Sequence, residues 1–353
     1  MDAKVETAPQ APAIRHQLRF EGSGGEYFKI WIVNLALTIA TLGIFSAWAK
    51  VRSKRYFYGN TYIGEHGFDY HGSPLRILVG RIIALAILLG YSATIHFAPA
   101  LTFAWILFFF FAVPWLVNAS LRFNARNSSY RNVRFNFTGT YGEAFFAYIL
   151  WPLLAAITLF TTYPLARRAR DQYNINNHSF GGKYFHAEIP GAAMYGIYIM
   201  GLLMFLGVMA VAGLLYAGLH TQPLDPKNPA SLTLLMIVLG GAYFLSALFL
   251  VTFIGTKVFN LVISRTLLAE RFQFESSLSP LYMTWLTFSN LLLTLATLGL
   301  FYPWARVSVA RYWAEHLAVT GPEGMDGFMS DFVTGQGAIG EEVASFFDVD
   351  IGL

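Results

Sequence analysis

The chain has 353 residues, of which 56% are hydrophobic and only 12% charged, and its net charge is +4. Soluble globular proteins carry about 25% charged residues, so this composition excludes an ordinary soluble protein. The sequence contains no cysteine, which excludes disulfides, thiolate metal sites and cysteine nucleophiles. In a membrane chain the basic excess is typical of a cytoplasmic face, and we expect no nucleic-acid partner.

The N-terminal segment, residues 1–17, is polar and includes a Pro/Ala stretch. It lacks the apolar stretch of a secretory signal peptide. We expect it to form a short disordered tail.

An internal repeat follows this tail. Shifting the sequence by 117 residues superposes Phe20 on Phe137 and Tyr56 on Tyr173, and a shift of 256 superposes Trp48 on Trp304. These matches predict three copies of one module, at residues 18–76, 133–190 and 272–320. Each copy contains a short strand, an apolar helix, a break, a basic aromatic helix and a hairpin-like stretch.

Two long apolar segments separate the modules. No charged residue lies between Arg81 and Arg122, a stretch of 40 residues, or between Glu188 and Asp225, a stretch of 36. A helix needs about 20 apolar residues to cross a bilayer. The sequence therefore predicts a transmembrane helix pair in 77–121 and another in 191–256, with spans at 77–97, 100–119, 195–218 and 232–255.

The apolar helix of each module, at 28–47, 144–165 and 282–303, either crosses the membrane or turns back within it. If all three cross, the 24 basic residues divide 11 to 13 between the two sides; if they turn back, the division is 23 to 1. Cytoplasmic loops are enriched in Lys and Arg, which favours the second arrangement. Both termini are then expected in the cytoplasm, and the turns at 97–99 and 219–231 in the periplasm.

The expected fold class is therefore a mainly α, polytopic helical membrane protein. Each of its three modules is expected to hold a broken, re-entrant apolar helix, a basic interfacial helix and a small β-hairpin-like cytosolic element. Irregular backbone at membrane depth requires burial in protein or a water-filled cavity.

Several stretches carry a family resemblance: FEGSGGEYF at 20–28, TLGIFSAWAKVR at 41–52, RYF at 55–57 and the C-terminal GEEVASFFDVDIGL at 340–353. In these stretches the chain resembles the YjgN-like family of bacterial inner-membrane proteins, a domain of unknown function. The resemblance implies a multi-pass inner-membrane protein without an established reaction, and it supplies no catalytic residues.

The basic aromatic helices supply the candidate binding residues, and two interpretations stay open. In one, they only anchor and orient the protein. In the other, they converge to bind an anionic lipid head group or ligand. The residues predicted for such a site are Trp48, Lys50, Arg52, Arg55, Trp304, Arg306 and Arg311.

Other polar motifs have simpler interpretations. The stretch Gly22 to Gly25 resembles a phosphate-binding loop but lacks the Lys-Ser/Thr that would follow, so we expect a turn and a helix N-cap. The group from Glu65 to His71 holds two His and two carboxylates, yet alternation along an extended chain separates them. We expect no metal site, no cofactor and no enzyme activity.

Residues 321–353 contain acidic but no basic residues, and we expect an acidic cytosolic tail. Two function classes follow. The preferred one is transport or lipid handling through a bundle of broken helices, with membrane lipids as partners. The alternative is a non-catalytic membrane scaffold or regulator that engages a partner protein through its cytosolic hairpins and the acidic C-terminal tail.

Overall fold

The structure, a computed structural model, describes residues 14–219 and 229–322. Ten antiparallel strands form a closed barrel in the order β1, β10, β9, β8, β7, β6, β5, β4, β3, β2. The strands are β1 (Ile14–Phe20), β2 (Thr61–Ile63), β3 (His66–Tyr70), β4 (Ser128–Tyr130), β5 (Val133–Phe137), β6 (His178–Phe180), β7 (Lys183–Ala187), β8 (Thr266–Leu268), β9 (Phe272–Ser276) and β10 (Leu317–Gly321).

Helices occupy the segments between alternate strands. They are α1 (Gly24–Ala40), α2 (Ser46–Gly59), α3 (Pro74–Phe97), the short η1 (Pro99–Leu101), α4 (Thr102–Arg126), α5 (Tyr141–Phe145), η2 (Phe146–Leu150), α6 (Trp151–Ile157), α7 (Tyr163–Asn176), α8 (Gly191–Leu219), α9 (Pro229–Ser264), α10 (Pro280–Ala296) and α11 (Tyr302–Glu315). The segments α5, η2 and α6 follow one another without a break and act as one helix.

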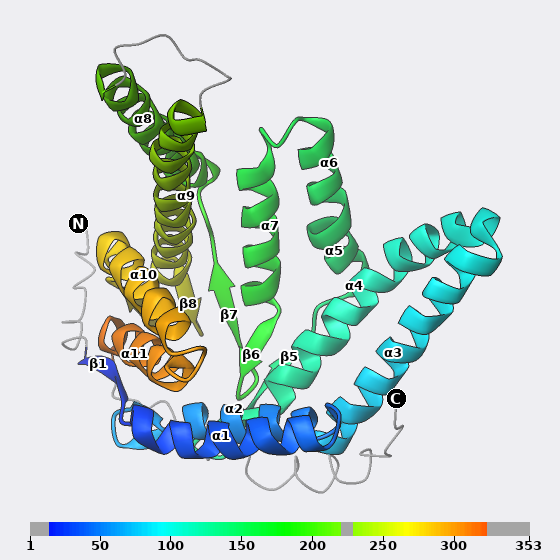
Figure 1. Cartoon of the computed structure of the whole chain (residues 1–353). Helices are drawn as coiled ribbons and strands as arrows, with labels where there is room; N and C mark the ends of the chain where they lie inside the picture. The colour runs from blue at the N-terminus through cyan, green and yellow to red at the C-terminus, as the bar shows by residue number, and fades with distance from the viewer. Residues whose placement is uncertain (1–13, 220–228, 323–353) are drawn as a thin grey trace, which may run out of the picture.

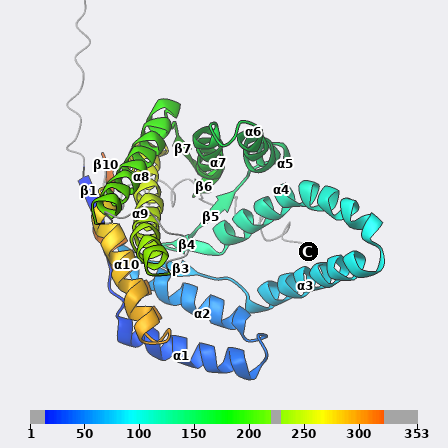
Figure 2. The same cartoon turned by 45° about the horizontal axis from the view of Figure 1, so that its top comes forward.

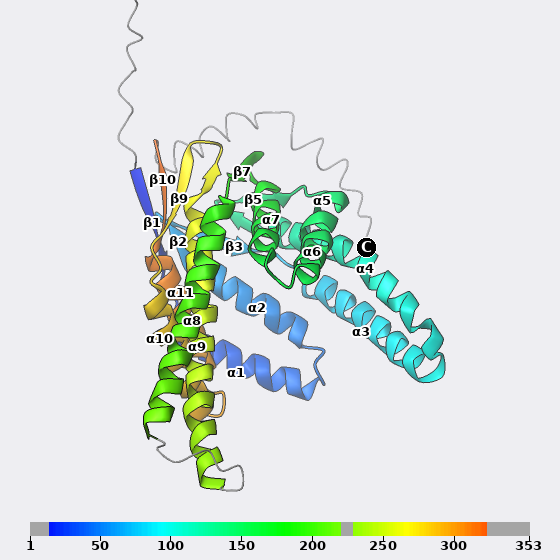
Figure 3. The ribbon, with the colours of Figure 1, turned by 90° about the horizontal axis from the view of Figure 1, so that it is seen from above.

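One pattern of elements, strand, helix, helix, strand, occurs five times along the described chain. Unit 1 runs from β1 to β2, unit 2 from β3 to β4, unit 3 from β5 to β6, unit 4 from β7 to β8 and unit 5 from β9 to β10. The two strands of each unit pair with each other. All five helix hairpins therefore leave the same rim of the barrel, here called the helix rim, and extend away from the strands (Figures 1 and 3).

The expected fold class was wrong. The hairpin-like stretches are not separate small cytosolic elements, because their strands pair from unit to unit and close into one barrel. The molecule is therefore not a purely helical bundle: its helices are attached in pairs to the rim of a β-barrel. The helix pairs at 77–121 and 191–256 belong to units 2 and 4, which have the same order of elements as the others.

Local sequence explains the opposite rim of the barrel, where tight turns join the units. The turn residues Arg131 and Asn132, Gly181 and Gly182, and Ala269 and Glu270 all have positive φ angles. Two-residue turns with positive φ at both positions match the twist of antiparallel strands. This turn rim also carries the pairing of Ile14 with Gly321, where β1 meets β10.

The helix rim is held by a repeated backbone hydrogen bond. The residue after the first strand of a unit donates its N–H to the carbonyl that ends the second helix of that unit. This bond joins Glu21 to Asn60 (3.0 Å), His71 to Asn127 (2.8 Å), Thr138 to Asn177 (3.0 Å) and Ser277 to His316 (3.0 Å). It satisfies a carbonyl at a helix end and fixes where each hairpin returns to the barrel.

Every strand contributes an apolar residue to the barrel interior. These residues are Leu18, Ile63, Phe68, Tyr130, Phe135, Phe180, Phe185, Leu268, Phe274 and Val319. Phe135 and Phe180 face each other across neighbouring strands with their ring centroids 4.8 Å apart. The side chains leave an apolar cavity of about 170 Å³ inside the barrel. A ten-stranded barrel is wider than an eight-stranded one, which large aromatic side chains partly compensate.

In each unit, the last residue of the first strand and the residue two positions later match in size at the turn that leads into the hairpin. In three units the first residue is aromatic and the second is glycine. In the other two units the first is small and the second is aliphatic. The pairs are Phe20 with Gly22, Tyr70 with Gly72, Phe137 with Gly139, Ala187 with Ile189, and Ser276 with Leu278. The three aromatic rings lie where a Cβ on the glycine would be, at 2.5 to 2.7 Å from their nearest atoms.

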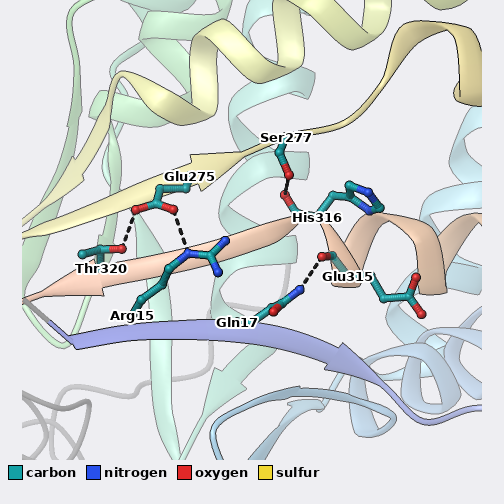
Figure 4. Close-up of polar contacts among 7 residues, drawn as sticks. All are labelled: Arg15, Gln17, Glu275, Ser277, Glu315, His316 and Thr320. Carbon is teal, nitrogen blue, oxygen red and sulfur yellow. Dashed lines mark hydrogen bonds and ion pairs between the residues drawn. The ribbon is translucent and has the colours of Figure 1, made fainter.

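Outward side chains reinforce the closure of the barrel, where β1 meets β10 (Figure 4). The Nε of Arg15 donates to a carboxylate oxygen of Glu275 at 2.9 Å, and the Thr320 hydroxyl donates to the other oxygen at 2.6 Å. These three residues come from β1, β9 and β10. The Glu275 carboxylate of β9 therefore reaches across β10 to β1 and holds together the two strands that end the described chain.

These contacts give the closure a predictable pH dependence. The hydrogen bonds from Thr320 and Arg15 lower the pKa of Glu275 below its ordinary value of 4.5. The ionised carboxylate is therefore favoured by folding, and its stabilisation is present above the ordinary pKa and lost as the pH falls through the folded-state pKa.

Glu275→Gln is expected to lower the free energy of unfolding at neutral pH by less than about 1 kcal/mol, because the pair is exposed. The difference from wild type should shrink as the pH falls below the ordinary glutamate pKa. Thermal unfolding of both proteins across acidic pH measures this. A difference that grows with acidity would contradict the assignment.

Candidate functional site at the base of the helix hairpins

The predicted basic residues near the barrel bind backbone carbonyls of the next unit. Arg55 Nε donates to the Tyr70 carbonyl at 3.2 Å, and Arg311 Nη2 donates to the Gly22 carbonyl at 3.1 Å. In unit 3, Gln172 donates to the Ala187 carbonyl at 3.2 Å in the position that matches Arg55. An uncharged amide does the same work there, so these contacts join units without requiring a ligand.

Arg52 lies within the first hairpin, between its two helices. Its Nη1 donates to Asn34 Oδ1 at 3.1 Å, and Asn34 is 4% exposed. The matching residues of unit 5 form a similar bond, from Asn290 Nδ2 to Ser308 Oγ at 3.1 Å. Polar pairs of this kind hold neighbouring helices together in an apolar environment.

The two tryptophans differ in their surroundings. Trp304 of α11 packs against Phe28 of α1 with ring centroids 5.0 Å apart, and a Cβ at Gly24 would lie 2.2 Å from its indole. It therefore joins unit 5 to unit 1. Trp48 stacks on Phe45 of its own hairpin at 6.1 Å.

Arg306 also points toward unit 1, where its guanidinium lies 5.1 Å from the centre of the Phe57 ring. Lys50 differs from the other predicted basic residues: it is exposed, and no described hydrogen bond or ion pair involves its side chain within residues 14–219 and 229–322. The seven predicted residues do not surround one cavity, because four of the five basic ones reach different neighbours in the protein.

A basic cluster where α2 meets α3 contains Lys50 together with residues that the sequence did not single out for a site. Ser46, Lys50 and Lys54 are spaced four residues apart and so share one face of α2. The Arg81 guanidinium, from α3, donates to the Ser46 hydroxyl. We define the basic cluster by Ser46, Lys50, Lys54 and Arg81. The four-residue spacing of Ser46, Lys50 and Lys54 is the part of it that can be recognised in the sequence.

Lys54 lies at the end of the basic cluster nearest the barrel. Its Nζ donates to Asn124 Oδ1 of α4 at 2.6 Å and lies 4.6 Å from the centre of the Tyr70 ring. Burial, followed by the positive charge of Lys50, lowers the pKa of Lys54 below its ordinary value. No described ion pair joins a carboxylate to Lys50, Lys54 or Arg81.

The family model described as "Bacterial protein of unknown function (DUF898)" matches residues 15–346. The chain belongs to the DUF898 family. The inner membrane protein YjgN of Salmonella typhimurium is 24% identical, with 87% of this chain and 89% of the relative aligned. The YjgN protein of Escherichia coli K12 is 30% identical over 152 residues, which are 42% of this chain and 37% of the relative.

These matches confirm the YjgN-like resemblance, and the relatives are named inner membrane proteins. No solved structure matches the DUF898 chain. Four described segments are long and apolar enough to cross a membrane: Pro74–Phe97, Pro99–Arg126, Gly191–Gly218 and Met236–Ser264. They lie where the sequence predicts spans.

Other predicted motifs of this DUF898 protein serve the fold. The Ser23 hydroxyl accepts the Glu26 N–H at 3.2 Å and caps α1, and His71 Nε2 lies 2.8 Å from Ser129 Oγ. In the described part of the chain, no group of three or more His, Cys, Asp or Glu side chains is placed to hold a metal ion. Residues 1–13 and 323–353, which include most of the predicted N-terminal and acidic tails, lie outside the described residues. Residues 14–17, which the sequence assigned to the N-terminal tail, form part of β1.

Proposed function

We propose that this protein handles lipids in the bacterial inner membrane. In this proposal the apolar helix hairpins insert into the bilayer, acyl chains occupy the space between the hairpins, and the barrel stays at the cytoplasmic surface. The proposal rests on one observation above all: α3 is a 24-residue apolar helix without a single buried residue.

The arrangement of the hairpins supports this proposal. Near the barrel each second helix contacts the first helix of the next unit, from α2 with α3 around to α11 with α1. Farther from the barrel the two long hairpins, α3–α4 and α8–α9, point away from each other (Figures 1 and 2). One side of α3 packs against α4, where Tyr91 contacts the rings of Trp105 and Phe109, yet no residue of α3 is buried. Because helices of a bundle bury a stripe against one another, an apolar helix this exposed requires a further apolar partner. In a membrane, acyl chains are that partner.

The hairpin ends are also apolar. Leu42 is 96% exposed, Leu298 95%, Phe97 88% and Leu159 85%. All four lie at hairpin tips, where one helix of the hairpin ends and the other begins. Exposed leucine and phenylalanine at such tips are unfavourable in water and favourable in the hydrocarbon core. This supports insertion of the short hairpins as well as the long ones.

The charge distribution supports an orientation. The charge-free stretch from Ile82 to Leu121 covers most of α3 and α4, whereas Arg76, Arg81, Arg122 and Arg126 lie at the ends near the barrel. The cytoplasmic side of membrane proteins is enriched in Lys and Arg. The barrel, and with it both ends of the described chain, is therefore assigned to the cytoplasm in this proposal.

A photoreactive phospholipid tests the lipid assignment. The protein is placed in nanodiscs that contain phospholipid with a diazirine near the end of its acyl chain, and the adducts are mapped by mass spectrometry. We expect adducts along α3, α4 and α8 and at the tips near Leu42 and Leu298, with none on the barrel strands. A matched probe with its diazirine on the head group should label the bases of the helices instead. Adducts of the chain probe on the strands, or none on α3, would contradict the proposal.

Cysteine labelling tests the orientation, and the cysteine-free chain makes it clean. Glu65→Cys places a thiol in an exposed turn of the barrel, and Ala100→Cys places one at the tip of the α3–α4 hairpin. In intact cells an impermeant maleimide is expected to label the second variant only, and both after lysis. Labelling of the Glu65→Cys variant from outside would reverse the orientation.

A further inference from the structure

The same position in three units meets three different environments. Lys50, Arg167 and Arg306 are related by the sequence shifts of 117 and 256 residues, and each lies near the start of the second helix of its unit. Arg167 Nε forms an ion pair with Asp171 Oδ2 at 2.7 Å. Arg306 lies over the Phe57 ring and donates to the Tyr302 hydroxyl at 3.3 Å. The protein thus provides a partner for the cation in units 3 and 5.

Unit 1 instead adds further cations at this position. The residue that matches Asp171 in sequence is Lys54, so the ion pair of unit 3 is replaced by two like charges. Arg81 brings a third positive charge from α3 to Ser46, one helical turn before Lys50. None of the ion pairs among residues 14–219 and 229–322 involves Lys50, Lys54 or Arg81.

Clustered cations without an acidic partner repel one another unless an anion joins them. Arg81 offers a planar set of donors, and the lysines offer ammonium donors in the same cluster, which together suit the oxygens of a phosphate. The basic cluster lies where the apolar part of α3 begins, because the residues that follow Arg81 are uncharged as far as Leu121. A phosphate held there belongs at the level where a bilayer changes from head groups to acyl chains.

We propose that the basic cluster of Ser46, Lys50, Lys54 and Arg81 binds the phosphate of an anionic phospholipid head group, whose acyl chains lie along α3. This inference rests on the proposed lipid-handling function and adds the class of lipid and the place where it binds. Unit 3 lacks such a site because Asp171 pairs with the matching cation, and unit 5 lacks it because Ala310 stands at the position of Lys54.

Native mass spectrometry tests lipid binding at the basic cluster. Wild type and the variant Lys50→Gln/Lys54→Gln are released from nanodiscs that contain equal amounts of phosphatidylglycerol and phosphatidylcholine. Wild type is expected to retain phosphatidylglycerol preferentially, and the variant to lose about tenfold of that preference. The control variant Arg134→Gln/Lys183→Gln removes the same charge from exposed positions on the barrel and should retain the wild-type preference.

Two further arms keep the outcomes distinct. Lys50→Arg/Lys54→Arg should restore the preference, and the melting temperatures of all variants show whether they fold. A preference that survives in the double Gln variant, or falls equally in the control, overturns the assignment of the lipid site to the basic cluster. A third measurement uses phosphatidylcholine nanodiscs with millimolar inorganic phosphate. A phosphate adduct that forms there and disappears in the double Gln variant would assign the site to free phosphate and would also overturn the proposal. If wild type retains no phospholipid of either kind, the lipid-handling function itself fails.

Discussion

Phe180→Ala is expected to lower the free energy of unfolding by about 3 to 5 kcal/mol. Phe180 is 2% exposed, lies inside the barrel, and faces the Phe135 ring at 4.8 Å and the Tyr130 ring at 6.3 Å. The substitution removes a large ring beside a cavity that already measures about 170 Å³. The remaining side chains cannot close both spaces, so the lost contacts are not recovered. Urea unfolding in detergent, followed by tryptophan fluorescence, measures the effect.

The matched control is Tyr184→Ala, which truncates an aromatic residue on the outward face of the neighbouring strand, opposite Ser179. Tyr184 is 53% exposed, and its loss should cost less than about 1 kcal/mol. Equal effects of the two substitutions would show that the barrel interior does not carry the stability assigned to it.

Gly139→Leu is expected to destabilise the protein strongly at unit 3 and to lower its melting temperature. A Cβ at Gly139 would lie 2.4 Å from the Tyr173 hydroxyl and 2.6 Å from the Phe137 ring, so both rings must move. Phe137 is 1% exposed and packs between Tyr173 and His178, with ring centroids at 5.8 and 4.9 Å. Overpacking a tight core typically costs about 1 to 3 kcal/mol, and contacts this short place the cost at the upper end or above it.

A second substitution separates this explanation from a general effect of leucine. Unit 5 has Ser276 and Leu278 at the positions of Phe137 and Gly139, beside a tyrosine, Tyr312, that matches Tyr173. The variant Phe137→Ser/Gly139→Leu therefore copies a combination that the same fold accepts. It should recover much of the melting temperature that Gly139→Leu loses. A double variant less stable than both single variants would contradict the size match.

The sequence predicts the long helices well because their signal is local. The charge-free stretch after Arg81 places a span at 77–97, and α3 occupies Pro74–Phe97. No distant residue is needed to recognise such a helix, since its apolar length alone is typical of a membrane span.

The barrel could not be predicted in the same way. Its strands are mostly three to five residues long, too short for a clear alternating pattern, and β1 closes the barrel by pairing with β10 at the other end of the described chain. Closure depends on contacts that no single segment contains. The glycine and tyrosine matches mark units 1 and 3, whereas units 2 and 4 lack some of them. In units 2 and 4 the start of the first helix is marked only by Ser73 and Pro190, each of which lies three residues after the end of its strand.

The candidate site was predictable in composition rather than in arrangement. The sequence placed basic residues on the second helices, and the structure gives several of them partners in adjoining units, as with Arg55 and Tyr70 or Arg311 and Gly22. Lys54 and Arg81 were missed because their relation to Lys50 depends on how α3 packs beside α2. Their role in binding lipid remains a prediction.

The central claim, that acyl chains surround the α3–α4 hairpin, is tested most directly by spin labels around α3. Ile82, Ile83, Ala84 and Leu85 are all exposed, and four consecutive positions sample the whole circumference of a helix. Each is replaced by a labelled cysteine in membranes, and its collisions with oxygen and with a water-soluble nickel complex are measured, with buried Ala144 as the control. The account predicts that all four labels are accessible to oxygen and shielded from nickel. A label shielded from both would show protein against α3, and one accessible to nickel would show water; either result would contradict the account.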